Sequence, residues 1–190
     1  MELTSQATGL PFETKLGWMA FAFGPWGLDC LTFDHHSPRA AQIGLQQLAR
    51  TRVTTQRASV KAASELSTDE IEHWSNMLYE RLCAYADGSP VTFDDVPLYL
   101  SRYTHFQQQV YTACRHVPAG TTLTYSELAT RVGSPLAARA IGNAMSRNRI
   151  PLVIPCHRVV GTHGSLGGFS SPSGLTMKRR LLAMEEGSGQ

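Results

Sequence analysis

The sequence predicts a mixed α/β (α+β) protein in which a small sheet-plus-helix domain precedes a mainly helical domain. Apolar runs on both sides of a Gly-Pro-Trp-Gly turn indicate a β-hairpin near the amino terminus, whereas helical spacing of apolar residues dominates after residue 67. The formal charge also changes sign: residues 1–100 carry 7 Lys and Arg against 12 Asp and Glu, and residues 101–190 carry 10 against 3. We therefore expect two domains, a supporting domain over residues 1–100 and a basic domain over residues 101–190.

The composition is that of a globular protein. Hydrophobic residues make up 42% of the 190 and charged residues 17%, which excludes disordered and coiled-coil classes. The longest apolar run, residues 18–23, is far shorter than the roughly 20 residues that span a bilayer. The amino terminus shows no targeting pattern. We therefore expect a cytoplasmic protein with no membrane partner.

Two strands and a short helix are predicted first. Residues 18–23 and 28–33 form the strands of the hairpin around the turn. A helix opens at Ser37-Pro38, with Ser as its cap, Pro in its first turn and apolar residues at positions 43, 45 and 48. The segment over residues 52–63 is polar and irregular.

A longer amphipathic helix follows. Ser67 and Glu70 match a capping box, and the helix extends to Gly88. Its apolar positions recur at helical spacing at Ile71, Trp74, Leu78, Leu82 and Tyr85. Prolines, adjacent aspartates and the change of charge sign place the domain boundary within residues 88–102.

In the second half of the chain, the sequence predicts three helices before residue 150. After a helix over residues 103–115, a helix over 126–132 with Ser126 as its cap is joined by the turn 133–135 to a helix over 136–148. The last two form a helix-turn-helix pattern, which occurs in DNA-binding proteins but is weakly specific because helix pairs are common.

The last of these helices combines small side chains with positive charge. Such a surface lets a DNA backbone approach closely, or it packs against another helix. A basic half suits a polyanionic partner, because cations that neutralise phosphates release counterions, although a solvated basic surface explains it too. The small residues are Ala137, Ala138, Ala140, Gly142 and Ala144, and the charged ones are Arg139, Arg147 and Arg149.

Four cysteines, Cys30, Cys83, Cys114 and Cys156, form no Cys-x-x-Cys pair, which disfavours zinc-ribbon and redox-pair sites. Structural disulfides are not expected in an intracellular setting, so each thiol is either a small buried apolar group or a reactive one. Cys30 with His35 and His36 does not complete a tetrahedral ligand set, and we therefore expect no metal.

The chemical signal is the string from Ile150 to Val160, IPLVIPCHRVV, which places Cys156 and His157 between two apolar stretches. It resembles the active-site segment of the O6-alkylguanine-DNA alkyltransferases, also called methylated-DNA–protein-cysteine S-methyltransferases. The resemblance covers roughly residues 101–186 and implies a winged-helix-like domain there. The first hundred residues match only loosely, and the family implies a ribonuclease-H-like fold for them. The other matching segments are residues 120–125, 138–142, 148, 167–169, 174–175 and 181–182.

The resemblance implies that an alkyl group on O6 of guanine in DNA, or on O4 of thymine, is transferred to Cys156 in a single irreversible turnover. An ordinary thiol, with a pKa near 8.5, is mostly protonated at neutral pH, so the reaction needs a base. His157 matches the family's histidine, which acts through a water molecule, and Glu185 matches the glutamate that orients it. Asn148 matches the asparagine that braces the active-site turn.

The resemblance also implies that the damaged nucleotide is flipped out of double-stranded DNA. Arg139 matches the arginine that fills the vacated stack, and Tyr125 matches the tyrosine that assists rotation and donates a hydrogen bond to the base. The second helix would enter the minor groove through Ala138, Ala140 and Gly142. The protein would act as a monomer without a cofactor, in the nucleoid or in a eukaryotic nucleus. Residues that would line the alkyl pocket are Met145, Pro151, Val159, Leu166, Phe169 and Ser170.

The pocket loop departs from the family's pattern. Many relatives have tyrosine at position 169 and a loop about two residues shorter around Ser171-Pro172-Ser173. The preferred size of the adduct therefore stays open.

Two other functions are weighed against repair. A non-catalytic DNA-binding module, either a lesion-sensing alkyltransferase-like protein or a helix-turn-helix regulator, is disfavoured because such sensors lack the acceptor that Cys156 supplies. A thiol hydrolase using Cys156 and His157 is disfavoured by the basic second half and its helix-turn-helix pattern.

Overall fold

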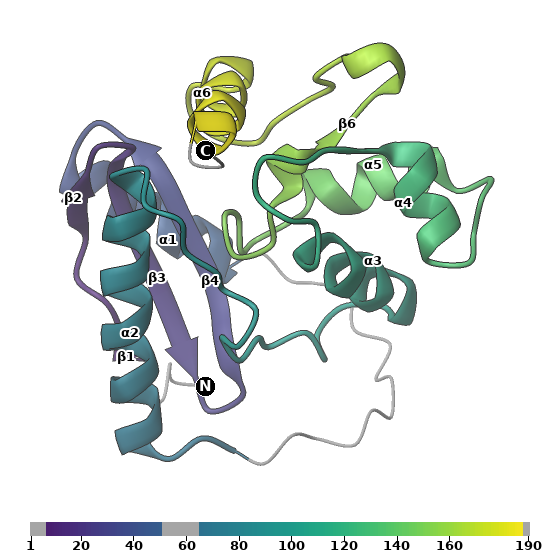
Figure 1. Ribbon diagram of the computed structural model, residues 1–190. Helices are drawn as coiled ribbons and strands as arrows, with labels where there is room; N and C mark the ends of the chain where they lie inside the picture. The colour runs from purple at the N-terminus through teal and green to yellow at the C-terminus, as the bar shows by residue number, and fades with distance from the viewer. Residues whose placement is uncertain (1–6, 51–64, 188–190) are drawn as a thin grey trace. The chain divides into compact units, whose positions relative to one another are not determined.

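The computed structural model describes residues 7–50 and 65–187 (Figure 1). The chain divides into two compact units, residues 1–104 and 105–190. The expected mixture of a small amino-terminal sheet with helices is confirmed. The irregular segment predicted over residues 52–63 lies outside the described residues.

The first unit is built on an antiparallel sheet whose central strand is β3. The strands are β1 (Ala7–Thr8), β2 (Phe12–Thr14), β3 (Gly17–Gly24) and β4 (Gly27–His35), and β3 pairs with each of the others. The hairpin expected from the sequence is the β3–β4 pair. Gly27 closes its turn at φ 112°, where an added Cβ would lie 2.5 Å from the Pro97 carbonyl oxygen, so no larger residue fits.

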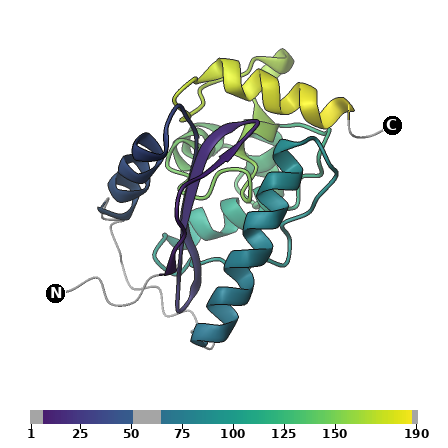
Figure 2. The same cartoon turned by 90° about the vertical axis from the view of Figure 1, so that its left-hand side faces the viewer.

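Two helices cover opposite faces of this sheet, as Figure 2 shows. Helix α1 (Pro38–Arg50) buries Ala41 and Leu45 against Ala20, Ala22 and Cys30. Helix α2 (Thr68–Ala86) packs on β1 and β3. Because both faces are covered, β3 carries a continuous apolar run instead of an alternating one.

The predicted caps of these helices are confirmed, whereas two apolar positions differ from expectation. Ser37 accepts from the Ala40 amide, and Ser67 and Glu70 form the capping box of α2. Ile43 is 45% exposed, because it lies off the face that carries Ala41 and Leu45. Trp74 is only half-buried.

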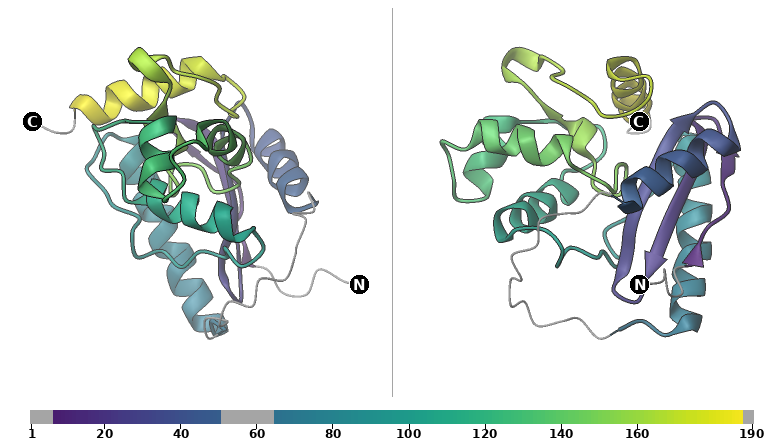
Figure 3. Two further views of the ribbon diagram at one scale, coloured as in Figure 1. Left: turned by 90° about the vertical axis from the view of Figure 1, so that its right-hand side faces the viewer. Right: turned by 180° about the vertical axis from the view of Figure 1, so that it is seen from behind.

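The second unit packs three helices together, α3 (His105–Arg115), α4 (Tyr125–Arg131) and α5 (Ala138–Ser146), seen in Figure 3. Strand β5 (Leu123–Thr124) pairs in parallel with β6 (Val159–Val160). The single-turn helices η1 (Cys156–Arg158) and η2 (Thr162–Gly164) flank β6, and α6 (Leu175–Gly187) packs on η1.

The boundaries of α4 and α5 correct the sequence-based expectation. Thr124, not Ser126, caps α4, because its hydroxyl accepts from the Glu127 amide while the Glu127 carboxylate accepts from the Thr124 amide. Helix α5 spans Ala138–Ser146 and not 136–148, since the Ala137 amide first closes a turn onto the Ser134 carbonyl. Helix α3 begins at His105, two residues later than expected.

Among the described residues, no helix is both long and apolar enough to cross a membrane. Within the same residues, no three His, Cys, Asp or Glu side chains gather as metal ligands would. His35 instead shares a hydrogen bond of 2.6 Å with the Thr32 hydroxyl.

Candidate functional site

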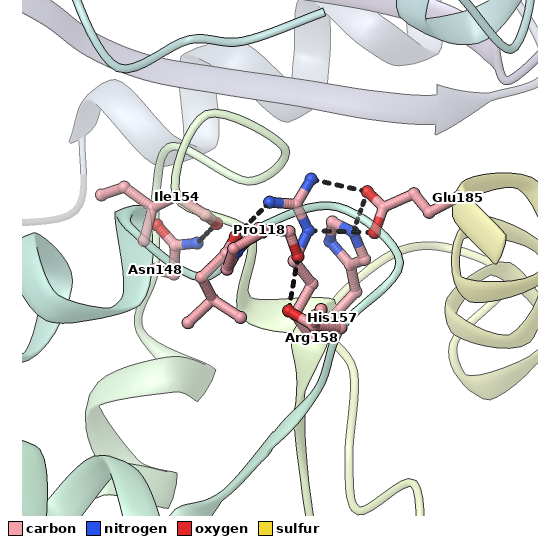
Figure 4. A network of polar contacts seen from close by, with 8 residues as sticks. Pro118, Asn148, Ile154, His157, Arg158 and Glu185 are labelled. Carbon is pink, nitrogen blue, oxygen red and sulfur yellow. Dashed lines mark hydrogen bonds and ion pairs between the residues drawn. The ribbon is translucent and has the colours of Figure 1, made fainter. Parts of the chain in front are cut away.

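Cys156 begins η1 at the end of a turn that Asn148 holds closed. The Asn148 side-chain nitrogen donates to the Ile154 carbonyl at 2.8 Å, and its oxygen accepts from the Ile150 amide at 3.0 Å. Figure 4 shows Asn148 reaching across this turn to Ile154. The bracing that was expected of Asn148 therefore has a direct geometric basis.

The Cys156 side chain is buried, and its surroundings act on the thiol in opposite directions. Burial has the largest effect on the pKa of the thiol, and it raises that pKa because the charged thiolate loses its hydration. A hydrogen bond from Asn148, the charge of Lys178, and the backbone amides of Cys156 and His157 each act to lower that pKa. The site thus shields the sulfur from bulk solvent while placing donors and a cation where the thiolate's charge develops.

His157 and Glu185 form a buried pair directly beside this cysteine. His157 Nε2 lies 2.9 Å from Glu185 Oε1, and the two side chains are 0% and 2% exposed. Burial lowers the pKa of His157, with Glu185 opposing that shift. Because a carboxylate can only accept, Nε2 carries the ring proton and Nδ1 is the basic nitrogen of the neutral ring.

Arg158 fixes the Glu185 carboxylate from the other side. Its Nε donates to Glu185 Oε2 at 2.9 Å and its Nη2 to Oε1 at 2.8 Å, while Nη1 donates to the Val117 carbonyl. Figure 4 shows this fork between η1 and α6. A bidentate pair of this kind fixes both the distance and the plane of the carboxylate that orients His157.

Lys178 is a buried residue of the candidate site that sequence reasoning missed. It is fully buried on α6, and its ammonium donates to the carbonyls of Val159, at 2.6 Å, and Leu166. Burial lowers the pKa of Lys178, and the neighbouring Cys156 and Cys114 thiols act to raise it. The sequence carried one signal: positions 178, 181 and 185 share a helical face, and two of these three residues are charged.

Tyr125 is half-buried at the start of α4. Burial and the nearby Cys156 raise its pKa, so the phenol stays protonated and can donate a hydrogen bond. Gly167, at φ 63°, leaves room for it: a Cβ there would lie 2.7 Å from the Tyr125 hydroxyl oxygen. The loop that carries Gly167 is therefore in close contact with Tyr125.

A hollow of about 500 Å³ lies beside Tyr125 on the second unit. It brings together four residues expected to contact DNA, namely Tyr125, Ala138, Arg139 and Gly142. Cys156 does not line it. Sequence reasoning missed the polar part of its lining, which consists of Thr124, Ser126, Asn143 and Thr162, together with Gly161.

Two residues of the expected DNA surface lie elsewhere. Ala140 is exposed but does not line the hollow, because it lies on another face of α5 from Ala138 and Gly142. Arg149, expected to supply surface charge, is 4% exposed. It follows α5 in the turn that leads to the buried residues Ile150 and Leu152, so its side chain is carried inward.

The expected pocket residues lie on α5, on the turn that follows it, on β6 and on the loop between η2 and α6. Val159 is completely buried, and Lys178 ties its carbonyl to that of Leu166. The Phe169 ring lies edge-to-face with His157, with 6.5 Å between ring centroids. Ser170 donates to the Ser146 carbonyl at 3.3 Å, beside the buried Met145, and Pro151 bridges to Ile154.

Comparisons with known proteins relate the second unit to a known family of domains. Residues 105–187 match the family model described as 6-O-methylguanine DNA methyltransferase, DNA binding domain. The helical unit is therefore of the class of DNA-binding domains found in these methyltransferases.

The wider comparisons extend this match beyond one domain. A methylated-DNA–protein-cysteine methyltransferase of Methanosarcina mazei is 45% identical over 106 residues, 56% of this chain and 65% of that protein. One of Methanosarcina barkeri is 41% identical over 129 residues, 66% of this chain and 78% of that protein. A crystal structure of Mycobacterium tuberculosis OGT in complex with DNA is 29% identical, with a TM-score of 0.65, and covers 94% of this chain and 92% of that one.

The chain belongs to the methylated-DNA–protein-cysteine methyltransferase family. This confirms the resemblance inferred from the Pro-Cys-His-Arg string. With respect to the Methanosarcina mazei relative, the matched region spans slightly less than two thirds of that protein's length.

Proposed function

We propose that this chain repairs O6-alkylguanine in double-stranded DNA by taking the alkyl group onto Cys156. The observation that carries the proposal is the buried Cys156 thiol beside the His157–Glu185 pair, in a chain of this family. Relatives named methylated-DNA–protein-cysteine methyltransferase and the DNA complex of the Mycobacterium tuberculosis protein support it.

In the proposed step, the Cys156 sulfur forms a bond to the alkyl carbon while the bond from that carbon to guanine O6 breaks. The thiol proton passes to neutral His157, through water as the family resemblance implies, and Glu185 stabilises the imidazolium that forms. Guanine leaves with the electron pair of the broken bond, and the Tyr125 hydroxyl stabilises its charge by donating to the base. A thioether does not readily revert, so one chain repairs one base.

The DNA side of the proposal uses the hollow and Arg139. A base inside a duplex is out of reach of a buried thiol, so the nucleotide is extruded at a cost of a few kcal/mol. Exposed Arg139 fills the gap, and the small residues of α5 allow the helix into the minor groove. The chain acts as a monomer on chromosomal DNA, in the nucleoid or the nucleus.

The alkyl pocket is proposed to lie between η1, α5 and the loop after β6. Met145, Pro151 and Val159 supply apolar surface, and Leu166, Phe169 and Ser170 belong to the loop that Lys178 and the Ser146 carbonyl hold in place. O4-alkylthymine is a second substrate that this pocket would admit.

Mass spectrometry of the intact protein tests the proposal. After mixing with a duplex that contains one O6-methylguanine, the protein should gain one methylene mass, confined to the Cys156 peptide and saturating at one per chain. A duplex with O4-methylthymine tests the second substrate in the same way. A Cys156→Ser variant should gain no mass while still binding the duplex.

Two results would contradict the proposal. Tight retention of the damaged duplex without any mass gain, by a reduced and folded sample, would indicate a lesion-binding module. Repeated turnover of an ester or a peptide would indicate a thiol hydrolase.

A further inference from the structure

The turn between α4 and α5 carries an apolar side chain that the proposed function does not use. Leu136 is 99% exposed, the highest value for any large hydrophobic residue among those the structure describes. The turn is hydrogen-bonded at both ends: the Ser134 amide donates to the Ala129 carbonyl, and the Ala137 amide to the Ser134 carbonyl, each at 2.9 Å. Figure 1 shows this connection standing out from the two helices. Leu136 is therefore held outward by a well-formed turn.

The charged residues near Leu136 in the sequence, at the tip of this turn, are all basic. No Asp or Glu occurs between Glu127 and Glu185, while Arg131 and Arg139 are exposed on either side of the turn. Ala138 and Arg139, which directly follow the tip, line the hollow beside Tyr125. An apolar tip between cations complements a polyanion whose surface also offers apolar patches.

We propose that Leu136 is a DNA contact that packs against a deoxyribose of the duplex bound at this face. The inference rests on the proposed function, because it takes duplex DNA as the partner of this face. Sugar rings in the groove walls are the apolar part of a nucleic-acid backbone, and minor-groove proteins use apolar side chains, leucine among them, in direct contact with DNA. Contacts to phosphate release counterions, whereas burial of a leucine against a sugar does not.

This difference gives the contact a signature of its own. We measure the Kd of the full-length protein for an undamaged 16-base-pair duplex by fluorescence anisotropy over a series of KCl concentrations. Leu136→Ala should raise Kd about five-fold at every salt concentration, from the apolar surface lost, and leave the slope of log Kd against log[KCl] unchanged. Leu136→Lys should steepen that slope by about one unit, since it adds a phosphate contact.

The matched control is Leu10→Ala, at an apolar position 86% exposed in the acidic half of the chain, which should change neither Kd nor slope. Because Leu136 makes no buried contact, the thermal unfolding of Leu136→Ala should match that of the wild type.

If Leu136→Ala binds the duplex like the wild type while Arg139→Ala binds it more weakly, Leu136 does not contact DNA, and the proposed DNA-binding surface around Arg139 is retained. If neither variant changes Kd, the DNA-binding face of the proposed function is itself wrong.

Discussion

The proposed reactivity of Cys156 would depend on its neighbours, because burial by itself raises the pKa of its thiol. Asn148, the backbone amides of η1 and Lys178 oppose that shift, and a neutral His157 is available to take the proton. The reactive state is therefore a property of the whole group of residues.

The pH dependence of alkyl transfer should report on His157. Its folded-state pKa is lowered from 6.5, so the ring stays neutral, and basic, as the pH falls through 6.5. The rate constant for repair of an O6-methylguanine duplex should therefore hold at pH 6.5 and fall only below it. Rapid-quench assays between pH 5 and 8 measure this, and a fall centred at or above pH 6.5 would contradict the assignment.

The same shift affects stability. Because the unfolded chain binds a proton on His157 more readily than the folded chain does, the free energy of unfolding should decrease as the pH falls below about 6.5. His157→Gln should remove part of this dependence, whereas His116→Gln, at an exposed position, should preserve it. Urea unfolding at pH 5.5 and 7.5 distinguishes the two.

Lys178 should matter for both rate and fold. Lys178→Met removes the cation that favours the thiolate and leaves the carbonyls of Val159 and Leu166 without their donor. We expect a repair rate at least about ten-fold lower at neutral pH, a rate profile displaced to higher pH, and a loss of about 2–3 kcal/mol of stability. Lys178→Arg, which keeps a positive charge, should repair faster than Lys178→Met. If the pH profile of Lys178→Met matches that of the wild type, the role of Lys178 is purely structural.

Gly167 should be needed because of Tyr125. Gly167→Ala places a Cβ 2.7 Å from the Tyr125 hydroxyl oxygen at a positive φ, so the loop or the phenol must shift. Its repair rate should fall several-fold. Gly168→Ala is the matched control, because an added Cβ there meets nothing within 4 Å, and it should repair at close to the wild-type rate. Equal repair rates for the two variants would show that the close approach of Gly167 to Tyr125 does not matter for repair.

At the scale of elements, the sequence predicted most of the helices and the hairpin because their signals are local. Ser67 and Glu70 marked the start of α2 through their own side chains. The start of α4 was placed wrongly because two hydroxyl residues, Thr124 and Ser126, both precede a helical pattern. Only Thr124 has Glu127 three residues after it, which completes the reciprocal hydrogen bonds.

The cap of α4 offers a test of this correction. Thr124→Ala should lower the free energy of unfolding by about 1 kcal/mol, because it removes the hydroxyl that accepts from the Glu127 amide. Ser126→Ala, at the position that sequence reasoning favoured, should cost less than half as much. Urea denaturation of the two variants measures the difference, and a larger loss for Ser126→Ala would reverse the assignment.

The proposed catalytic segment could be located in the sequence for a different reason from the rest of the candidate site. Cys156, His157 and Asn148 lie within nine residues of one another, so a single string of sequence carries them. Arg149 could not be placed as a buried residue from composition or periodicity, and the helical face shared by positions 178, 181 and 185 was only a weak signal for Lys178, because charged residues are almost never fully buried unless partners compensate them. The partners of Lys178 are the carbonyls of Val159 and Leu166, which only the folded chain brings near its ammonium group.

At the scale of the whole molecule, charge and chemistry lie in the same half of the chain. Residues 101–190 hold both the excess of arginine and the Cys156 site. The first unit, with its sheet between two helices, contributes none of the residues proposed to react. Its ribonuclease-H-like assignment, like the winged-helix-like assignment of the second unit, stays a prediction.

Arg139 should separate recognition of the duplex from the chemistry. Arg139→Ala should slow repair of a damaged duplex at least about ten-fold, because the vacated stack is no longer filled, yet react normally with free O6-methylguanine base. Arg147→Ala, an exposed arginine that does not line the hollow, should lose much less on the duplex. Single-turnover rates on the duplex and on the free base measure the two effects. An equal loss of rate on both substrates would show that Arg139 does not act in nucleotide flipping.

Helix α6 contributes both Lys178 and Glu185, which lie 22 and 29 positions after the cysteine they serve. A ribosome making this chain therefore releases the sulfur before the groups that tune it. Cys156 would then gain its proposed reactivity only once α6 has been made and has docked on η1. The order of the residues along the chain would thus tie the proposed chemistry to completed folding of the second unit.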